Sequence, residues 1–305
     1  MRTGLRLAPL VAVLQAAVVT HGAAQAALST DLWRVAAGTL VVPAAIATDA
    51  SAALWTPAFA VPDGPGLGLR LGVESIHAPA DAGVSGAVAS AAVRILGELT
   101  VNAVYGRLWL GDLVRTESSP EAIGTIPAYA EVVSLGVARR SPGRPLTVGA
   151  ALRVLTGRLD YESATRLAGD VGIEYAGPHL RLGAATHFLD PAAAREQGTA
   201  CAGAAEYRTS RVLLWGSPAF LSVRYGLTWS RGDGAAHLVS AGLALGEAFE
   251  LDAGAANERA AAEALWRSRV GAAILVGAYR VYLARDGGVN GFGATYRFGM
   301  AATVR

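Results

Sequence analysis

Four arginines occupy equivalent positions in four segments of alternating residues. In each segment every second residue is apolar, and the arginine lies among the small or polar residues between them. The four are Arg153, Arg181, Arg224 and Arg297. Neighbouring side chains of a β-strand point to opposite faces, so each arginine would project from the face that the apolar side chains avoid. A guanidinium in such a place can pair with a carboxylate or attract an anion.

Carboxylates are available on the same kind of face. Asp170 and Glu174 share the parity of the small residues in their segment, and Glu250 and Asp252 are further candidates. The arrangement predicts an internal ion-pair network, and the alternative is a pore that attracts anions. We favour the network because positive and negative residues occur together.

Side chains for other kinds of chemistry are sparse. His77 and His187 lack the HExxH or HxH spacing of metal sites, so neither a metal nor another cofactor is expected. Ser222 and His187 both fall on polar faces, but a nucleophilic serine needs a histidine within hydrogen-bond reach, and their strands are not expected to be neighbours. Cys201 is expected to be an ordinary thiol in a loop at 190–203. The sequence therefore predicts a protein that is not an enzyme.

The segments that carry these residues alternate over about nine or more positions. They span 146–154, 180–188, 221–230 and 292–300. Further strands are expected at 67–76, 84–95, 99–114, 128–139, 165–176, 205–215, 237–245, 248–257 and 266–276. Turn signals such as Ser141-Pro142-Gly143 separate them, which predicts an antiparallel meander. Longer connections are expected at 115–126, 159–164 and 190–203.

The composition suggests that part of the surface does not face water. Hydrophobic residues make up 52% and charged residues 16%, against about 25% charged residues in an average soluble domain. The net charge of +2 is small and spread along the chain, so nucleic acid is not an expected partner. Arg2 and Arg6 precede an apolar stretch at 7–19 and the small residues around Ala26, which predicts a secretory signal peptide over residues 1–26.

Two architectures use long strands with two different faces. A β-sandwich buries its apolar face, whereas a membrane barrel turns that face to lipid and its small and polar face to the lumen. Sandwich strands are about five to six residues long, and a tilted strand needs about nine to eleven residues to cross a bilayer. Tyr225, Trp229, Tyr296 and Phe298 lie toward the ends of apolar faces, as girdle residues do. The sequence therefore predicts an all-β protein, an antiparallel transmembrane β-barrel of about 14 strands over residues 67–305, in contact with outer-membrane lipid.

Residues 47–58 read Ala-Thr-Asp-Ala-Ser-Ala-Ala-Leu-Trp-Thr-Pro-Ala. They resemble the N-terminal motif of PorV/PorQ-type outer-membrane proteins, which are related to the long-chain fatty-acid transporter barrels. Residues 148–185 and 291–299 resemble the central hairpins and closing strand of that family, although Thr56 stands where the family has Asn before Pro57. The resemblance implies a location in the cell outer membrane and a secretion-associated scaffold that binds exported proteins. The alternative is a channel for the uptake of hydrophobic small molecules.

Residues 27–66 are expected to hold an N-terminal strand and a segment that plugs the lumen. A single helical turn before Trp55 would end at Pro57, because proline pushes Thr56 out of the α region. A free segment of this apolarity would expose Trp55 to water, which is unfavourable. We therefore expect the segment to fold back into the lumen, with Trp55 buried and Asp49 among the lumen residues.

Overall fold

The computed structural model describes most of the chain beyond the predicted signal peptide. The described residues are 32–34, 36–61, 68–78, 83–95, 97–111, 113–116, 121–189, 199–230, 234–246, 248–260, 263–288 and 293–304. The signal peptide predicted for residues 1–26 and the strand start predicted at residue 67 lie outside them.

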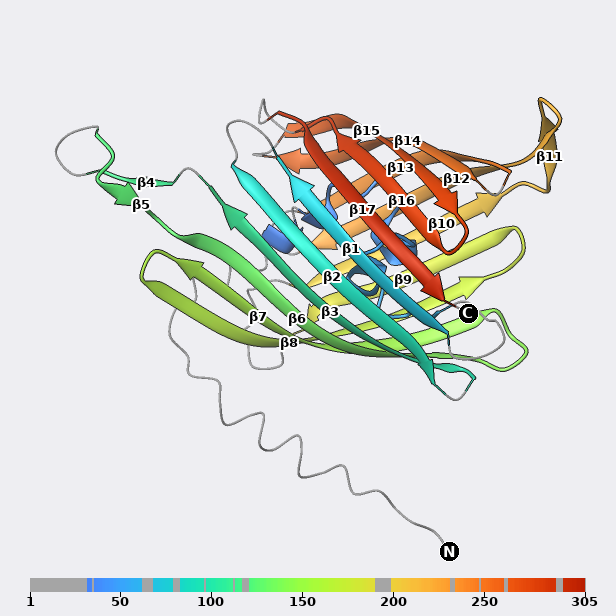
Figure 1. Ribbon diagram of the computed structural model, residues 1–305, viewed down its shortest axis with the longest axis horizontal. Helices are drawn as coiled ribbons and strands as arrows, with labels where there is room; N and C mark the ends of the chain where they lie inside the picture. Colours follow the sequence, from blue (N-terminus) through green and yellow to red (C-terminus); the bar gives the residue numbers. More distant parts are fainter. Residues whose placement is uncertain are drawn as a thin grey trace, which may run out of the picture.

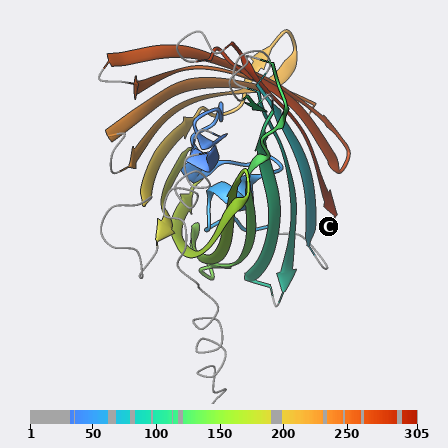
Figure 2. The same ribbon diagram turned by 90° about the vertical axis from the view of Figure 1, so that its left-hand side faces the viewer.

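Long antiparallel strands form one sheet that curves round until its ends meet (Figure 1, Figure 2). In the described part of the chain this sheet has 15 strands, and β11 (Val212–Leu214) pairs only with β12, so 14 strands form the ring. The ring closes where β1 pairs with β17 and where β10 pairs with β12. The ring strands are β1 (Leu69–His77), β2 (Val84–Ile95), β3 (Leu99–Leu110), β6 (Ala128–Arg140), β7 (Leu146–Leu159), β8 (Glu162–Ala176), β9 (Leu180–Leu189), β10 (Ala200–Arg208), β12 (Ser217–Ser230), β13 (Gly234–Leu245), β14 (Phe249–Ala260), β15 (Glu263–Val276), β16 (Tyr279–Asp286) and β17 (Thr295–Val304).

The two faces of the strands differ as the alternation predicts. Along β12, Leu221, Val223 and Tyr225 are exposed on the outer face, and Ser222 between them is buried on the inner face. Large apolar side chains are exposed in the same way on the other long strands. The predicted antiparallel barrel is confirmed, and its outer wall carries the apolar surface that a bilayer requires.

The connections divide between two ends of the barrel. At the turn end, where β17 finishes, strands are joined by short stretches such as 141–145 and 177–179. At the loop end the β3–β6 connection carries a ribbon of β4 (Val114–Arg115) and β5 (Gly124–Thr125), which projects beyond the wall in Figure 1. The longer connection expected at 159–164 is instead a tight turn, because Asp160 adopts a positive φ of 55° that lets β7 return directly as β8.

Two strands differ from the sequence-based expectation. The strand expected at 205–215 lies at Ala200–Arg208, so Cys201 belongs to β10 and not to a loop. A run of small residues from 202 to 205 hides the alternation there, because both faces look alike in the sequence. The strand β16 was not expected, because Arg280 on its inner face and Arg285 on its outer face blur the pattern.

Residues 36–61, called the inner segment below, run inside the ring of strands (Figure 2). Their elements are the 3-10 helix η1 (Ala44–Ile46) and the α-helix α3 (Ala52–Trp55). The described residues of 27–66 contain no strand, and the other residues of this range, where an N-terminal strand was also expected, lie outside the described part of the chain. Among the described strands, each strand of the ring has two neighbours in it. As predicted, α3 ends where Thr56 becomes extended before Pro57.

Among the described residues, no helix combines the length and the hydropathy needed to cross a membrane.

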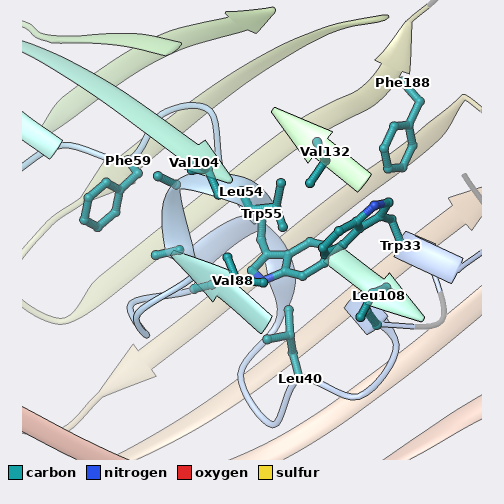
Figure 3. Close-up of a cluster of buried hydrophobic side chains, with 14 of the residues drawn as sticks. Trp33, Leu40, Leu54, Trp55, Phe59, Val88, Val104, Leu108, Val132 and Phe188 are labelled. Carbon is teal, nitrogen blue, oxygen red and sulfur yellow. The ribbon is translucent and has the colours of Figure 1, made fainter. Parts of the chain in front are cut away.

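The main buried cluster lies inside the barrel, between the inner segment and the wall. Figure 3 shows Leu54 and Trp55 of the inner segment packed in one cluster with Trp33 and with Leu108 and Val132 of the wall. The ring centroids of Trp33 and Trp55 are 6.2 Å apart. Each fully buried aliphatic side chain contributes about 1.5–3 kcal/mol, so this cluster holds the inner segment against the strands.

Candidate functional site in the barrel lumen

Glycines on the inner wall let the inner segment approach the strands closely. A Cβ added at Gly72 of β1 would lie only 2.6 Å from the carbonyl oxygen of Ala50. A Cβ added at Gly149 of β7 would overlap the carbonyl group of Pro57. The absence of side chains at these positions therefore creates the space that the backbone of the inner segment fills.

Arginines of the wall donate hydrogen bonds to backbone carbonyls of the inner segment. The pairs are Arg297 with Ala36, Arg267 with Gly38 (2.8 Å), Arg269 with Leu40 (2.9 Å), Arg70 with Asp49 (3.0 Å) and Arg153 with Leu54. An irregular segment inside a barrel has carbonyl groups without helix or sheet partners, and a buried unpaired carbonyl is costly. The arginines satisfy these acceptors with charge-assisted hydrogen bonds.

Glu74 of β1 is the centre of a buried network that joins the wall to the inner segment. Its carboxylate pairs with Arg297 of β17 and accepts a hydrogen bond from Tyr282 of β16. The Ser51 hydroxyl donates to Glu74 over 2.7 Å, and the indole nitrogen of Trp55 donates to Ser51 over 2.8 Å. Trp55 is therefore buried, at 3% exposure, and its polar atom is also satisfied. The network spans the junction where the first and last strands close the ring.

Asp49 lies at the edge of this network. The Ser51 hydroxyl is 3.2 Å from its carboxylate, and Arg70 binds the Asp49 backbone rather than the carboxylate. The pKa of Asp49 is raised from 3.8 to about 6, mainly by burial and, to a smaller extent, by the neighbouring negative charge of Glu74. The charge of Asp49 therefore changes at a mildly acidic pH.

A second buried network lies on the opposite wall. Arg153 of β7 and His187 Nδ1 of β9 both bind Oδ2 of Asp170 on β8, the histidine at 2.8 Å. The backbone N–H of Phe188 donates to Oδ1 of Asp170 over 2.9 Å. Arg153 also reaches Leu54 of the inner segment, so this network, too, connects wall and segment.

Other charged side chains of the inner face form further ion pairs. Arg181 binds Glu174 at 2.6 Å, Arg280 binds Glu250 at 2.7 Å, Arg269 binds Asp286 at 2.7 Å, and Arg224 binds both Glu206 and Asp252. The four arginines singled out in the sequence thus each meet a carboxylate. The arrangement is an ion-pair network, and several of its arginines also anchor the inner segment, a function that the sequence did not suggest.

The other residues considered from the sequence are placed as follows. Thr56 is buried, and its backbone N–H donates to the carbonyl oxygen of Ala52 over 2.9 Å. Ser222 and His187 are not brought together, because β10 lies between their strands. His77 is exposed, with Nδ1 3.0 Å from the Ser85 hydroxyl. Among the described residues, no group of three or more His, Cys, Asp or Glu side chains is arranged to hold a metal ion.

A cavity of about 650 Å³ lies between the inner segment and the loop end of the barrel. Its floor includes Leu40, Pro43 and Trp55 of the inner segment, and its upper wall reaches Ser230 and Thr295 at the ends of β12 and β17. Small and apolar residues make up most of the lining, together with four arginines and two histidines, of which His187 is buried and His237 is half-buried. Pockets of this size and character hold small organic molecules in other proteins.

Several members of this site were missed in the sequence. Glu74 and Gly72 lie on the same inward face of β1, so the alternation of this strand could have identified Glu74. Asp286 could not be found in this way, because β16 itself was not expected. The cavity depends on how the inner segment folds back, and no local pattern encodes that.

No known family model and no curated protein matches the sequence. The fold is similar to that of the toluene transporter TbuX from Ralstonia pickettii, with a TM-score of 0.54 and 11% identity over 85% of this chain and 95% of TbuX. It is also similar to the toluene transporter TodX from Pseudomonas putida, with a TM-score of 0.51 and 12% identity over 86% of this chain and 96% of TodX. CdiB from Acinetobacter baumannii is a looser match, with a TM-score of 0.45 over 60% of its length. At these identities the likeness is one of fold, to barrels of the bacterial outer membrane.

Proposed function

We propose that the protein is a passage for hydrophobic small molecules across the cell outer membrane and has no enzymatic activity. The observation that carries the proposal is the cavity of about 650 Å³, which is lined mainly by small and apolar residues inside a barrel with an apolar outer wall. The free energy of a hydrophobic solute falls when it moves from water into such a cavity. In this proposal the inner segment plugs the lumen below the cavity.

Two of the similar structures with TM-scores above 0.5 support this choice. Both TbuX and TodX are described as toluene transporters, and this chain matches nearly the whole length of each. The ionic network does not conflict with it. Its arginines that line the cavity, Arg153, Arg267 and Arg269, pair with carboxylates of the wall and hold the inner segment, and small and apolar residues make up most of the lining.

Whole-cell uptake of radiolabelled toluene tests the proposal. The host should be a Gram-negative strain whose lipopolysaccharide slows hydrophobic solutes, and the protein should be shown to reach its outer membrane. Ala202 of β10 lines the cavity, whereas Ala205 of the same strand pairs with the outward-facing Leu182 and Tyr225. We expect the wild-type protein and Ala205→Phe to raise uptake and Ala202→Phe to abolish the rise. No rise with correctly assembled wild-type protein would refute the proposal.

The second candidate is the secretion-associated scaffold that the PorV/PorQ resemblance implies. The observation in its favour is the β4–β5 ribbon, which exposes Val114 and Ile123 to 51% and 56%. Arg115 of the ribbon binds Asp160 at 2.5 Å and Tyr161 at 2.7 Å, which fixes the ribbon to the β7–β8 turn. An exposed apolar surface on a fixed support suits the binding of an exported protein.

Secretion in the native host distinguishes the two candidates. A scaffold predicts that deletion of the gene, and the double change Val114→Glu with Ile123→Glu, both lower the amount of exported protein in the medium. A passage predicts normal secretion in both strains and slower uptake of hydrophobic solutes in the deletion strain alone.

A further inference from the structure

We propose that His187 is a polar anchor in the cavity and selects hydrophobic molecules that carry one hydroxyl group, such as alkylphenols. This inference rests on the proposed passage for hydrophobic molecules and names its substrate class. It starts from an irregularity in the wall of the barrel.

The pairing of β8 with β9 shifts at Asp170. Gly169 pairs with Leu189 and Val171 pairs with Thr186, so Asp170 faces two residues, His187 and Phe188. A bulge of this kind changes the direction of side chains, and bulges are common next to binding sites. Here it turns two consecutive side chains inward, with His187 at 7% and Phe188 at 3% exposure, which a regular strand cannot do.

The bulge requires an unusual backbone. Phe188 has a φ of 58°, in the left-handed region that a residue with a bulky side chain rarely adopts. Such strain persists where the surrounding structure enforces it, and it concentrates at functional sites. The enforcing contact is Asp170, which accepts hydrogen bonds from the Phe188 backbone N–H over 2.9 Å and from His187 Nδ1 over 2.8 Å.

The hydrogen bonds decide what His187 offers to the cavity. An ionised carboxylate only accepts hydrogen bonds, so the imidazole donates to Asp170 through Nδ1–H. The neutral ring then has a lone pair on Nε2, which is an acceptor. Among the described residues nothing bonds to Nε2, although the atom is buried and His187 lines the cavity. A buried acceptor without a partner is unfavourable, and a ligand that donates a hydrogen bond to it removes that cost.

The surroundings of Nε2 define the rest of the ligand. Phe188, Leu108 and Trp55 line the same cavity, and Figure 3 shows them in one buried cluster. The ligand is therefore an apolar body with a single O–H donor. A plain hydrocarbon leaves Nε2 unpaired, and an ether of the same shape has no hydrogen to donate.

Calorimetric titration of the purified full chain in detergent-free amphipol at pH 8 tests this selection. The probes are p-cresol, toluene and 4-methylanisole, which share the methylated ring and differ in the hydroxyl. We expect wild-type protein to bind p-cresol about tenfold more tightly than 4-methylanisole, the ratio that one buried hydrogen bond of about 1.4 kcal/mol gives. This comparison needs no variant.

Two histidine variants locate the effect. His187→Asn keeps a donor at the place of Nδ1 and removes the Nε2 acceptor, so the preference for p-cresol should fall about tenfold. His77→Asn makes the same change at the exposed His77, whose Nδ1 also bonds a neighbouring side chain, and should leave the preference unchanged.

The outcomes separate the inference from the proposed function. Binding of toluene with no preference for p-cresol over 4-methylanisole overturns the His187 anchor and leaves the passage intact. A preference that survives in His187→Asn, or tighter binding of p-toluate than of p-cresol, also overturns it. If the wild-type protein binds none of the probes, the proposed passage fails, and the anchor fails with it.

Discussion

Replacement of Glu74 by Gln should destabilise the folded barrel more than any surface change of the same kind. Glu74 and Arg297 have side-chain exposures of 0% and 2%, so both charges are out of water. Gln keeps one acceptor and adds an N–H₂ group beside the donors of Ser51 and Tyr282. Removing one partner of a buried ion pair leaves an uncompensated charge and costs about 3–5 kcal/mol.

Urea unfolding in lipid vesicles, followed by the change in gel mobility, measures the effect. At a dependence of about 1–3 kcal/mol per molar urea, the predicted loss lowers the midpoint by roughly 1 M or more. The matched control is Glu98→Gln beside the β2–β3 turn, because Glu98 pairs with Arg139 at 3.9 Å with exposures of 39% and 69%. Such an exposed pair contributes at most about 1 kcal/mol.

The double variant Glu74→Gln with Arg297→Met tests the cause of the loss. If the stranded charge is responsible, removal of Arg297 should restore part of the midpoint, since no buried charge then lacks its partner. The reasoning is wrong if Glu74→Gln lowers the midpoint no more than Glu98→Gln does. It is also wrong if the double variant loses more stability than the two single variants lose together.

Three further predictions concern the inner segment and the outer wall. The pKa of Asp49 is raised to about 6, so Asp49 binds its proton more tightly in the folded protein, and the resulting stability is present below about pH 4 and lost as the pH rises through 6. Urea midpoints between pH 4 and 7 should show this fall, of no more than about 3 kcal/mol, and Asp49→Asn should remove it. Leu227→Arg places a charge on the lipid face, at a free-energy cost of about 2–4 kcal/mol, and should lower the yield of membrane-integrated protein. Thr228→Arg, on the lumen face, should lower this yield less. Equal yields for the two variants would contradict the assignment of faces. Acrylamide quenching should differ little between wild type and Trp55→Phe, because Trp55 is 3% exposed, and a readily quenched difference signal would disprove its burial.

The alternation of apolar and polar residues was sufficient to predict the barrel, because a membrane strand needs apolar side chains on its lipid face and tolerates charged ones on its lumen face. Leu221, Val223 and Tyr225 must be apolar outside, and Arg224 is tolerated only inside, so the pattern survives in the residues themselves. It failed where a strand has small residues on both faces, as in β10, or a charge on each face, as in β16. The alternation also did not predict the bulge at Asp170, because the bulge depends on side-chain hydrogen bonds between neighbouring strands.

The same alternation predicted that four arginines point inward, namely Arg153, Arg181, Arg224 and Arg297. It did not predict which carboxylate each of them binds. Parity limits a partner to the inner face, and register then decides which carboxylate is adjacent. Asp170 and Glu174 could be proposed because they lie on the strand next to or near the arginines in sequence. Glu74 lies at the other end of the chain from Arg297, and only closure of the ring brings the two together.

The anchoring of the inner segment limits how a passage can open. Five arginines hold its carbonyls, and a hydrogen bond from a charged donor contributes about 1.5–3 kcal/mol. Loss of all five would cost about as much as the whole stability of a typical domain, so expulsion of the entire segment is too unfavourable to occur in each transport cycle. Pro43 lies between the anchors at Leu40 and Asp49 and lines the cavity floor. We therefore expect opening to be a local shift of the backbone around Pro43, with the anchors on either side kept in place.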